Sequence, residues 1–382
     1  MKNQNGNFLV ALFQNIDWVL VGALIPLVLA GLMTMNSFVD ANVYFSRQII
    51  WIIISFAAFF IFSTIDFKFL RRSQVVVWLF LGSVLLLFSL FVLGSVVKGA
   101  QSWLSFGFFN VQPAEVVKLV LILVLAKYFS RRHVAIKNIR HVIVSGLYAF
   151  IMFVLVLVQP DFGSALIIFM IWFGMIMVSG ISKKHLLLVF VVGTLAFAAM
   201  WTGVLQDYQK ARIMTFLHPL QDIQGTGYNA YQSTIAVGSG QVTGKGLGYG
   251  TQSRLSFLPE YQTDFIFAAF AEEWGFVGVI ILFLLFGVVM WRIIINAMYG
   301  ATNFEVLFGM GVAIMIMSHF VVHVGMNIGL LPVTGITIPF MSYGGSHLLV
   351  TFVALGVVMG MRRYARAAHK DLLQNEFLGL GG

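Results

Sequence analysis

An acidic residue, Asp264, stands where a long polar segment meets a long apolar one. It falls within the run Phe257-Leu-Pro-Glu-Tyr-Gln-Thr-Asp-Phe-Ile-Phe-Ala268. A carboxylate at such a junction contacts water on one side and lipid on the other, so it could act as a general base on a substrate with a polar head and an apolar tail. Asp is also a preferred residue for capping a helix N-terminus. Residue type and spacing leave both interpretations open.

Glu115 and Lys118 begin another apolar segment, within Gln112-Pro-Ala-Glu-Val-Val-Lys118. Because they are three residues apart, they share a helix face and can pair. Pro113 suits the first position of a helix and Glu115 suits the helix N-terminus, so a structural role is as good an explanation as a functional one. A lysine inside a helical bundle could also bind a phosphate.

Three further acids have simpler explanations. Glu272 and Glu273 follow Asp264 by about two helical turns. At about 100° per residue, Glu272 is turned about 80° from Asp264 and Glu273 lies nearly opposite, so Glu272 is the one expected to share a cavity with Asp264. Either carboxylate could instead bond a neighbouring helix. Asp161, in Gln159-Pro-Asp-Phe-Gly163, is expected to cap the next helix.

Two other patterns could bind ions. His319 and His323 are four residues apart, but no third ligand or His-Glu-x-x-His pattern accompanies them, so we expect hydrogen bonds between helices and predict no metal site. The run Gly244-Lys-Gly-Leu-Gly-Tyr-Gly250 is not a Walker motif, because Gly246 stands where Ser or Thr belongs. Its backbone amides could still bind an anion.

The composition determines the class of protein. The 382 residues are 60% hydrophobic and 10% charged, with a mean hydropathy of +0.94, which predicts a polytopic membrane protein. Cysteine is absent, so no disulfide framework or thiolate metal site is expected. The segment from Met1 to Ile16 lacks a basic region and a cleavage site, so no cleaved signal peptide is expected.

Ten segments are long and apolar enough to be expected as transmembrane helices. They lie near residues 17–35, 49–65, 75–97, 114–130, 142–158, 162–180, 185–202, 264–291, 304–326 and 343–361.

Lysine and arginine concentrate on alternate connections. One side would hold sixteen of them: Lys2, Lys68, Arg71, Arg72, Lys127, Arg131, Arg132, Lys137, Arg140, Lys183, Lys184, Arg292, Arg362, Arg363, Arg366 and Lys370. The other would hold six: Arg47, Lys98, Lys210, Arg212, Lys245 and Arg254. The positive-inside rule then places both termini in the cytoplasm. This distribution accounts for much of the net charge of +9 without nucleic acid.

Two connections are unusual. Residues 203–263 form a loop of about 60 residues on the outer side, with short helices expected near 208–218 and 228–237. Residues 327–343 are apolar but interrupted by two prolines and by glycine, which predicts a re-entrant loop at membrane depth. No internal repeat is evident. We therefore expect one integral membrane domain over 1–382, ending in a cytoplasmic tail at about 362–382.

Several stretches resemble the SEDS family (shape, elongation, division and sporulation), over about residues 15–365. They are Lys98-Gly-Ala-Gln-Ser-Trp103, Gln112-Pro-Ala-Glu-Val-Val-Lys118, Gln159-Pro-Asp-Phe-Gly-Ser-Ala165, Gly244-Lys-Gly-Leu-Gly-Tyr-Gly-Thr-Gln252, the Asp264 run, and Leu331-Pro-Val-Thr-Gly-Ile-Thr-Ile-Pro-Phe-Met-Ser-Tyr-Gly-Gly-Ser346. The Gly-Thr-Gln-Ser and Pro-Val-Thr-Gly runs favour the rod-shape branch over the division branch. Two residues depart from the family pattern: Ser102 stands where many members have Arg, and His347 where a small residue is common.

The resemblance implies a bacterial cytoplasmic-membrane enzyme. It would polymerise lipid II into glycan strands on the outer face, during cell elongation, together with a class B penicillin-binding protein and other membrane proteins of the elongation complex. The essential aspartate of the family falls on Asp264. The matching motifs place substrate binding on Lys118, Glu115, Trp103, Gln112, Lys245, Arg254, Gln262, Thr263, Ser342, Tyr343, Gly344, Gly345 and Ser346.

In the mechanism that this implies, Asp264 removes a proton from the acceptor hydroxyl, and the configuration of the donor sugar is inverted. Lys118 is the first candidate for binding the departing pyrophosphate, followed by Lys245 and Arg254; a divalent cation such as Mg²⁺ or Mn²⁺ could assist. Grooves between spans would hold the lipid tails. The alternatives are a lipid II flippase and a scaffold for the penicillin-binding protein.

Overall fold

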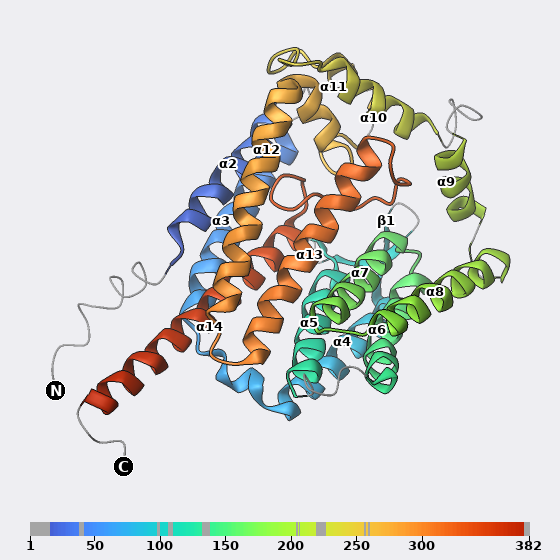
Figure 1. Cartoon of the computed structure of the whole chain (residues 1–382). Helices are drawn as coiled ribbons and strands as arrows, with labels where there is room; N and C mark the ends of the chain where they lie inside the picture. The colour runs from blue at the N-terminus through green and yellow to red at the C-terminus, as the bar shows by residue number, and fades with distance from the viewer. Residues whose placement is uncertain are drawn as a thin grey trace.

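The computed structural model describes residues 16–37, 42–97, 100–105, 110–131, 138–203, 205, 207–218, 227–255, 257–258 and 260–377 (Figure 1). Lys98, Gly99 and Pro259 of the matched motifs lie outside these residues. The elements are α2 (Trp18–Asn36), α3 (Asn42–Thr64), η1 (Phe67–Arg71), α4 (Ser73–Leu93), β1 (Ser95–Val97), β2 (Ala100–Ser105), β3 (Asn110–Val111), α5 (Pro113–Ser130), α6 (Ile139–Val158), α7 (Phe162–Val178), α8 (Lys183–Gly203), α9 (Asp207–Leu217), α10 (Tyr228–Ser239), α11 (Thr251–Arg254), α12 (Ile266–Met298), α13 (Asn303–Asn327) and α14 (Gly345–Phe377).

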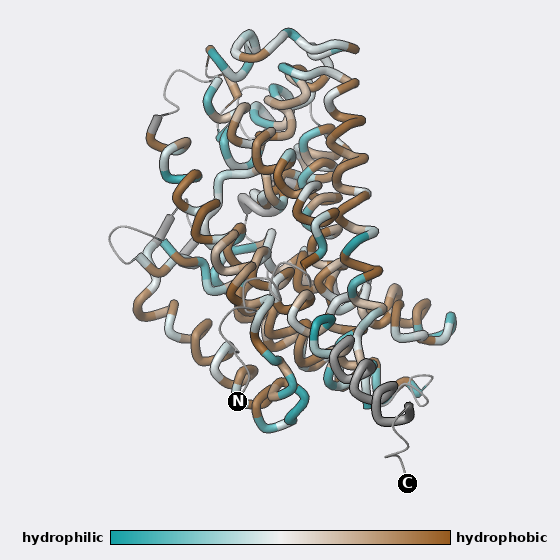
Figure 2. Tube along the Cα trace, turned by 90° about the vertical axis from the view of Figure 1, so that its left-hand side faces the viewer, coloured by the Kyte–Doolittle hydropathy of each residue, from teal (hydrophilic) through white to brown (hydrophobic). Residues whose placement is uncertain are grey.

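Within the described residues, eight helices are long and apolar enough to cross a membrane: α2, α3, α4, α6, α8, α12, α13 and α14. Hydrophobic residues run along them, whereas hydrophilic residues gather in the connections (Figure 2). The apolar helix α7 is shorter, with 17 residues. Helix α5 carries Glu115, Lys118 and Lys127. The chain is thus a polytopic, predominantly helical membrane protein.

A small antiparallel sheet between α4 and α5 departs from the expected purely helical fold. Helix α4 ends at Leu93, four residues before the expected end of the third span, and the chain continues into three strands in the order β1-β2-β3. Ser95 pairs with Trp103, and Leu104 with Val111. Strands of two to six residues are too short to show a clear alternation in sequence.

Helix α12 is interrupted, although the sequence analysis expected one continuous span over 264–291. Gly275 has φ 65° and ψ −167°, outside the helical range. The glycine-rich segment 244–250 lies against this break, where the Lys245 amide donates to the Glu272 carbonyl at 3.0 Å. The Phe276 amide donates to the Gln241 carbonyl at 2.9 Å. The loop thus supplies partners for backbone groups that a regular helix would satisfy internally.

The two unusual connections match their predictions in part. The long loop contains α9 and α10, close to the two short helices expected, together with α11 (Figure 1). Residues 328–344 contain no helix, and Ile338, Phe340 and Met341 are buried in the main hydrophobic core. Irregular backbone packed among helices in this way is the form that a membrane interior tolerates.

Helix α13 packs against α5, α7 and α12, and α14 packs along α3. A close approach to α5 depends on Gly311, where an added Cβ would lie 2.5 Å from Cγ2 of Ile122. Small residues of this kind allow membrane helices to pack closely. This packing brings α5, α13 and the start of α14 together around the site described next.

Candidate functional site

Asp264 lies in a turn, not at the helix cap. Its amide donates to the Glu260 carbonyl at 3.1 Å, and α12 begins at Ile266 with Phe265 as its N-cap residue. The alternative that Asp264 is the N-cap is therefore wrong. Asp264 is half-buried.

The turn that carries Asp264 is fixed by a residue that the sequence analysis missed. Asn327, fully buried at the end of α13, donates from Nδ2 to the Asp264 carbonyl at 3.0 Å. Its Oδ1 accepts from the Ala268 amide at 3.2 Å. One side chain thus links the turn before α12 to the first turn of that helix. Sequence offered only a polar residue at the junction between an apolar span and the expected re-entrant loop as a signal.

The irregular segment 328–344 runs beside the same turn. Ser342 Oγ donates to the Thr263 carbonyl at 2.8 Å, and the Tyr343 amide donates to the Gln262 carbonyl at 2.8 Å. A Cβ added at Gly335, which has φ 73°, would lie 3.6 Å from Oδ2 of Asp264. Two motifs about 70 residues apart in sequence therefore form one surface around the Asp264 carboxylate.

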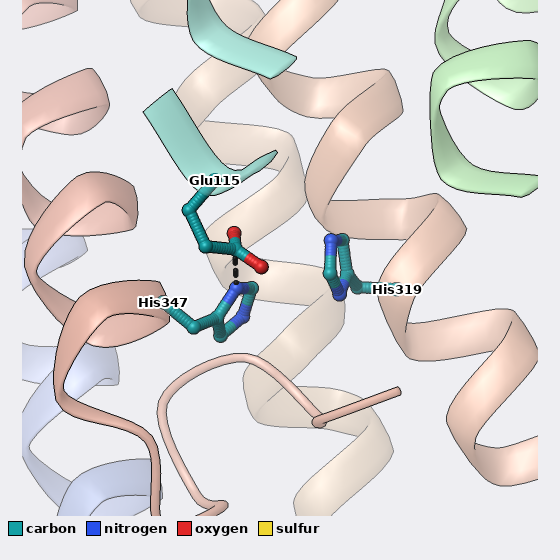
Figure 3. Close-up of side chains that lie close together, drawn as sticks. All are labelled: Glu115, His319 and His347. Atoms are coloured by element: carbon teal, nitrogen blue, oxygen red, sulfur yellow. Dashed lines mark hydrogen bonds and ion pairs between the residues drawn. The ribbon is translucent and has the colours of Figure 1, made fainter. Parts of the chain in front are cut away.

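A buried charged cluster joins α5, α13 and α14 (Figure 3). Lys118 Nζ lies 2.7 Å from Glu115 Oε1 and 3.0 Å from His319 Nε2. His347 Nδ1 lies 3.0 Å from Glu115 Oε2. Lys118 has no exposed surface, and Glu115 is 4% exposed. The predicted Glu115–Lys118 pair is confirmed, and the two histidines complete it.

With Lys118 as an ammonium and Glu115 as a carboxylate, the hydrogen bonds assign a form to each histidine. An ammonium can only donate, so His319 Nε2 accepts from Lys118 and its proton lies on Nδ1, which is 3.3 Å from the Thr337 carbonyl. A carboxylate only accepts, so His347 Nδ1 carries the proton shared with Glu115. His347, one of the two departures from the family pattern, thus has a defined partner.

Asp264 and this cluster border the same short stretch of chain. Gly335 lies against Asp264, and Thr337 bonds His319. Two residues span at most about 7 Å. The segment 335–337 therefore places the carboxylate and the Lys118 cluster on neighbouring parts of one site.

Other predicted residues occupy the rim of this arrangement. The Gln112 amide donates to Ser346 Oγ at 3.2 Å, and Gln112 Nε2 donates to Asp161 Oδ2 at 2.8 Å. Asp161 also accepts from the Ser164 amide, which confirms its prediction as a helix cap. Gly345 opens α14 and packs against Trp51.

Glu272 does not point to Asp264, contrary to expectation. It is fully buried, and its Oε1 accepts from Lys245 Nζ at 2.7 Å and from the Gln252 amide at 3.1 Å. Glu273 Oε1 accepts from the Gly248 amide at 3.0 Å. Glu272 and Glu273 precede the break at Gly275, and the glycine-rich loop packs against them, so amides expected to bind an external anion bind the protein itself.

Three more predicted residues have distinct positions. Trp103 lies half-buried on β2, and its carbonyl accepts from Ser95 Oγ at 3.0 Å. Arg254 is exposed at the end of α11. Gly344 lies in the turn before α14, where an added Cβ would contact Thr337.

His319 and His323 both form bonds outside their own helix, as expected. His323 Nδ1 bonds the Ile336 carbonyl at 2.6 Å, so His319 and His323 bind adjacent carbonyls of segment 328–344. No third ligand for His319 is evident in the sequence around it. The structure places Glu115 and His347 beside it, with one potential ligand atom from each residue within 4.8 Å of the others.

Together, the fold and the site define a polytopic membrane protein whose ionisable residues converge beside an irregular segment between its helices. A model of the FtsW/RodA/SpoVE family of cell cycle proteins matches residues 9–367, and the chain belongs to this family.

Its relatives carry consistent names. It is 39% identical over 288 residues to the probable peptidoglycan glycosyltransferase FtsW of Thiomicrospira cyclica, covering 74% of this chain and 73% of that protein. It is 34% identical over 295 residues to the peptidoglycan glycosyltransferase MrdB of Escherichia coli K12, covering 77% and 80%.

Two solved structures share the fold. One is a chain in a structure that describes the structural coordination of polymerization and crosslinking by a peptidoglycan synthase complex. It aligns with TM-score 0.78 and 30% identity, covering 91% of this chain and 98% of that one. The rod-shape-determining protein RodA of Thermus thermophilus aligns with TM-score 0.68 and 29% identity, covering 91% and 96%.

Proposed function

We propose that this protein is a peptidoglycan glycosyltransferase that polymerises lipid II on the outer face of the cytoplasmic membrane, with Asp264 as general base. The names of its relatives support the reaction class. The observation that carries the role of Asp264 is its position. It is half-buried, precedes the helix cap, and lies beside Gly335 in segment 328–344. In the same segment, Thr337 bonds His319, which contacts Lys118.

In this reaction, Asp264 takes the proton from the 4-hydroxyl of the acceptor sugar as that oxygen attacks the anomeric carbon of the donor. The new carbon–oxygen bond replaces the bond to undecaprenyl pyrophosphate, which leaves with its electron pair. Attack from the opposite face converts the α-linked donor into a β-1,4 bond. One positioned base typically contributes about 10²–10⁴-fold in rate.

The leaving pyrophosphate gains negative charge and needs a cation. We assign this role first to Lys118, which Glu115 and His319 hold in place. Lys245, whose ammonium is paired with Glu272, and Arg254, which is exposed in the outer loop, are the next candidates. A divalent cation could share the task through the pyrophosphate oxygens.

We further propose that α5 and α7 cross the membrane with the eight longer helices, which gives ten spans and places both termini in the cytoplasm. The distribution of lysine and arginine supports this topology. Residues 203–263 would then lie outside, and 327–343 would be re-entrant.

The likeness to RodA and to the synthase complex supports a role in elongation with a class B penicillin-binding protein.

The test is polymerisation of purified lipid II by the purified protein with its transpeptidase partner, read as glycan ladders on a gel. Wild type should form ladders, whereas Asp264→Asn should form none and Lys118→Met far fewer. Each variant must stay monodisperse and bind the partner. Equal ladders from Asp264→Asn would disprove the base role, and full activity of Lys118→Met would disprove the pyrophosphate role. No ladders from any protein, with an active partner, would favour a flippase or a scaffold.

A further inference from the structure

The Glu115, His319 and His347 side chains converge from three helices on one buried point (Figure 3). Each offers a metal-ligating atom, and these atoms lie within 4.8 Å of one another. All three residues are at most 6% exposed. Two imidazoles and one carboxylate form a ligand set typical of zinc sites that keep a fourth position open.

The cluster already binds a cation. The Lys118 ammonium lies 2.7 Å from Glu115 Oε1 and 3.0 Å from His319 Nε2, both of which face it with lone pairs. His347 Nε2 is buried and makes no hydrogen bond within the described part of the chain. This leaves a further nitrogen of the cluster without a partner.

We propose that Glu115, His319 and His347 form a binding site for a divalent transition metal ion of the zinc type, which the Lys118 ammonium occupies when the metal is absent. Imidazole suits Zn²⁺, Ni²⁺ and Cu²⁺, whereas Mg²⁺ prefers oxygen ligands and retains water. The site is therefore distinct from any Mg²⁺ that accompanies the pyrophosphate.

Charge balance makes the two occupants mutually exclusive. With neutral histidines, one carboxylate and one ammonium give a neutral cluster. A divalent ion added beside the ammonium would leave two net positive charges buried among the helices, which is strongly unfavourable. Metal therefore enters only when the ammonium moves away, and Lys118 lowers the metal affinity of the wild type.

This competition connects the metal to the reaction. A bound ion would take the Glu115 and His319 contacts that hold Lys118, so it would inhibit polymerisation. That consequence rests on the proposed function, whereas metal binding itself does not depend on it.

The experiment measures Zn²⁺ binding to full-length protein in detergent, purified with a tag that contains no histidine and treated with a chelator. Lys118→Met removes the competing ammonium with little change in length, and Lys118→Met/His347→Ala also removes one ligand. We expect Lys118→Met to bind one Zn²⁺ per chain at least about 10²-fold more tightly than wild type, because this variant has no ammonium to displace, and a divalent ion is repelled by a like charge about 4 Å away twice as strongly as a unit charge would be. The double variant should lose this gain.

A second measurement applies if Lys118→Met is unstable in the absence of metal. Zn²⁺ should raise the Tm of Lys118→Met, or restore a monodisperse protein when it is added during purification, because a ligand that binds only the folded state stabilises it. Mg²⁺ should do neither. Equal zinc affinity in Lys118→Met and the double variant, or failure of Zn²⁺ to restore an unstable Lys118→Met, would overturn the proposal.

Discussion

Asn327 provides a direct test of how the Asp264 turn is held. Replacing Asn327 with Ala leaves the Asp264 carbonyl without its 3.0 Å donor and the Ala268 amide without its 3.2 Å acceptor. Leaving the buried Ala268 amide without a partner costs about 1–3 kcal/mol, so we expect a loss of at least this size in unfolding free energy. The turn should also shift relative to segment 328–344.

A displacement of about 1 Å at a catalytic group can cost about 10²-fold in rate. We therefore expect Asn327→Ala to slow lipid II polymerisation by about one to two orders of magnitude at a temperature where the variant is fully folded. The matched control is Ser233→Ala, which removes the 2.9 Å bond to the Asn327 carbonyl and the 3.3 Å bond to Asn327 Oδ1 but retains the Asn327 side chain and its two bonds to the turn. Ser233→Ala should keep nearly full activity.

The assay combines a thermal unfolding scan with single-turnover formation of glycan product. Substrate binding is measured separately on each variant, so that a change in the chemical step can be distinguished from a change in affinity. If Asn327→Ala were less stable yet polymerised at the wild-type rate, the carbonyl bond would not position Asp264, and our account of the turn would be refuted.

Two further predictions concern charged contacts away from the Asp264 turn. Glu272→Gln should lower stability by about 1.5–3 kcal/mol because it removes the charge-assisted bond to Lys245, whose side chain is 29% exposed, and Lys245→Met should recover part of this loss in the double variant; additive effects in thermal unfolding would contradict the pairing. At the start of α2, burial would raise the pKa of the Asp17 carboxyl, but bonds from Arg292 and Asn296 hold that pKa below its ordinary value. The unfolding free energy contributed by the Asp17 carboxylate is therefore fully present above the ordinary pKa of about 3.9 and is lost as the pH falls through the lower folded-state pKa. The difference in unfolding free energy between wild type and Asp17→Asn should consequently become smaller in acid. A difference that increases below pH 4 would refute this.

Several features of the fold could be predicted from local sequence. Long apolar segments identify most of the membrane helices because a bilayer requires about 20 apolar residues per span. The pairing of Glu115 with Lys118 follows from their spacing on one helix, and Asp161 caps α7 as its position predicts. The short sheet was missed because its strands are shorter than the pattern that would reveal them.

The partners of the buried charges could not be predicted in this way. The helical wheel directed Glu272 toward Asp264, but Asp264 precedes α12, and Glu272 bonds the glycine-rich loop. The sequence predicted that His319 and His323 would bond other helices, and His319 does face Lys118 on α5, but their spacing did not identify this partner. A helical wheel does not apply to a residue outside the helix, and it contains no information about which neighbouring helix will face a given residue.

The sequence by itself determined that this is a polytopic membrane protein, that its lysines and arginines favour one topology, and that Asp264 stands at the entrance of a membrane helix. Only the tertiary structure decided that Asp264 is not a cap and that His347 meets Glu115, 232 residues away. The reason is physical: hydrophobicity and helix periodicity act over neighbouring residues, whereas a buried charge is satisfied by whichever groups the packing of distant helices brings within hydrogen-bond distance.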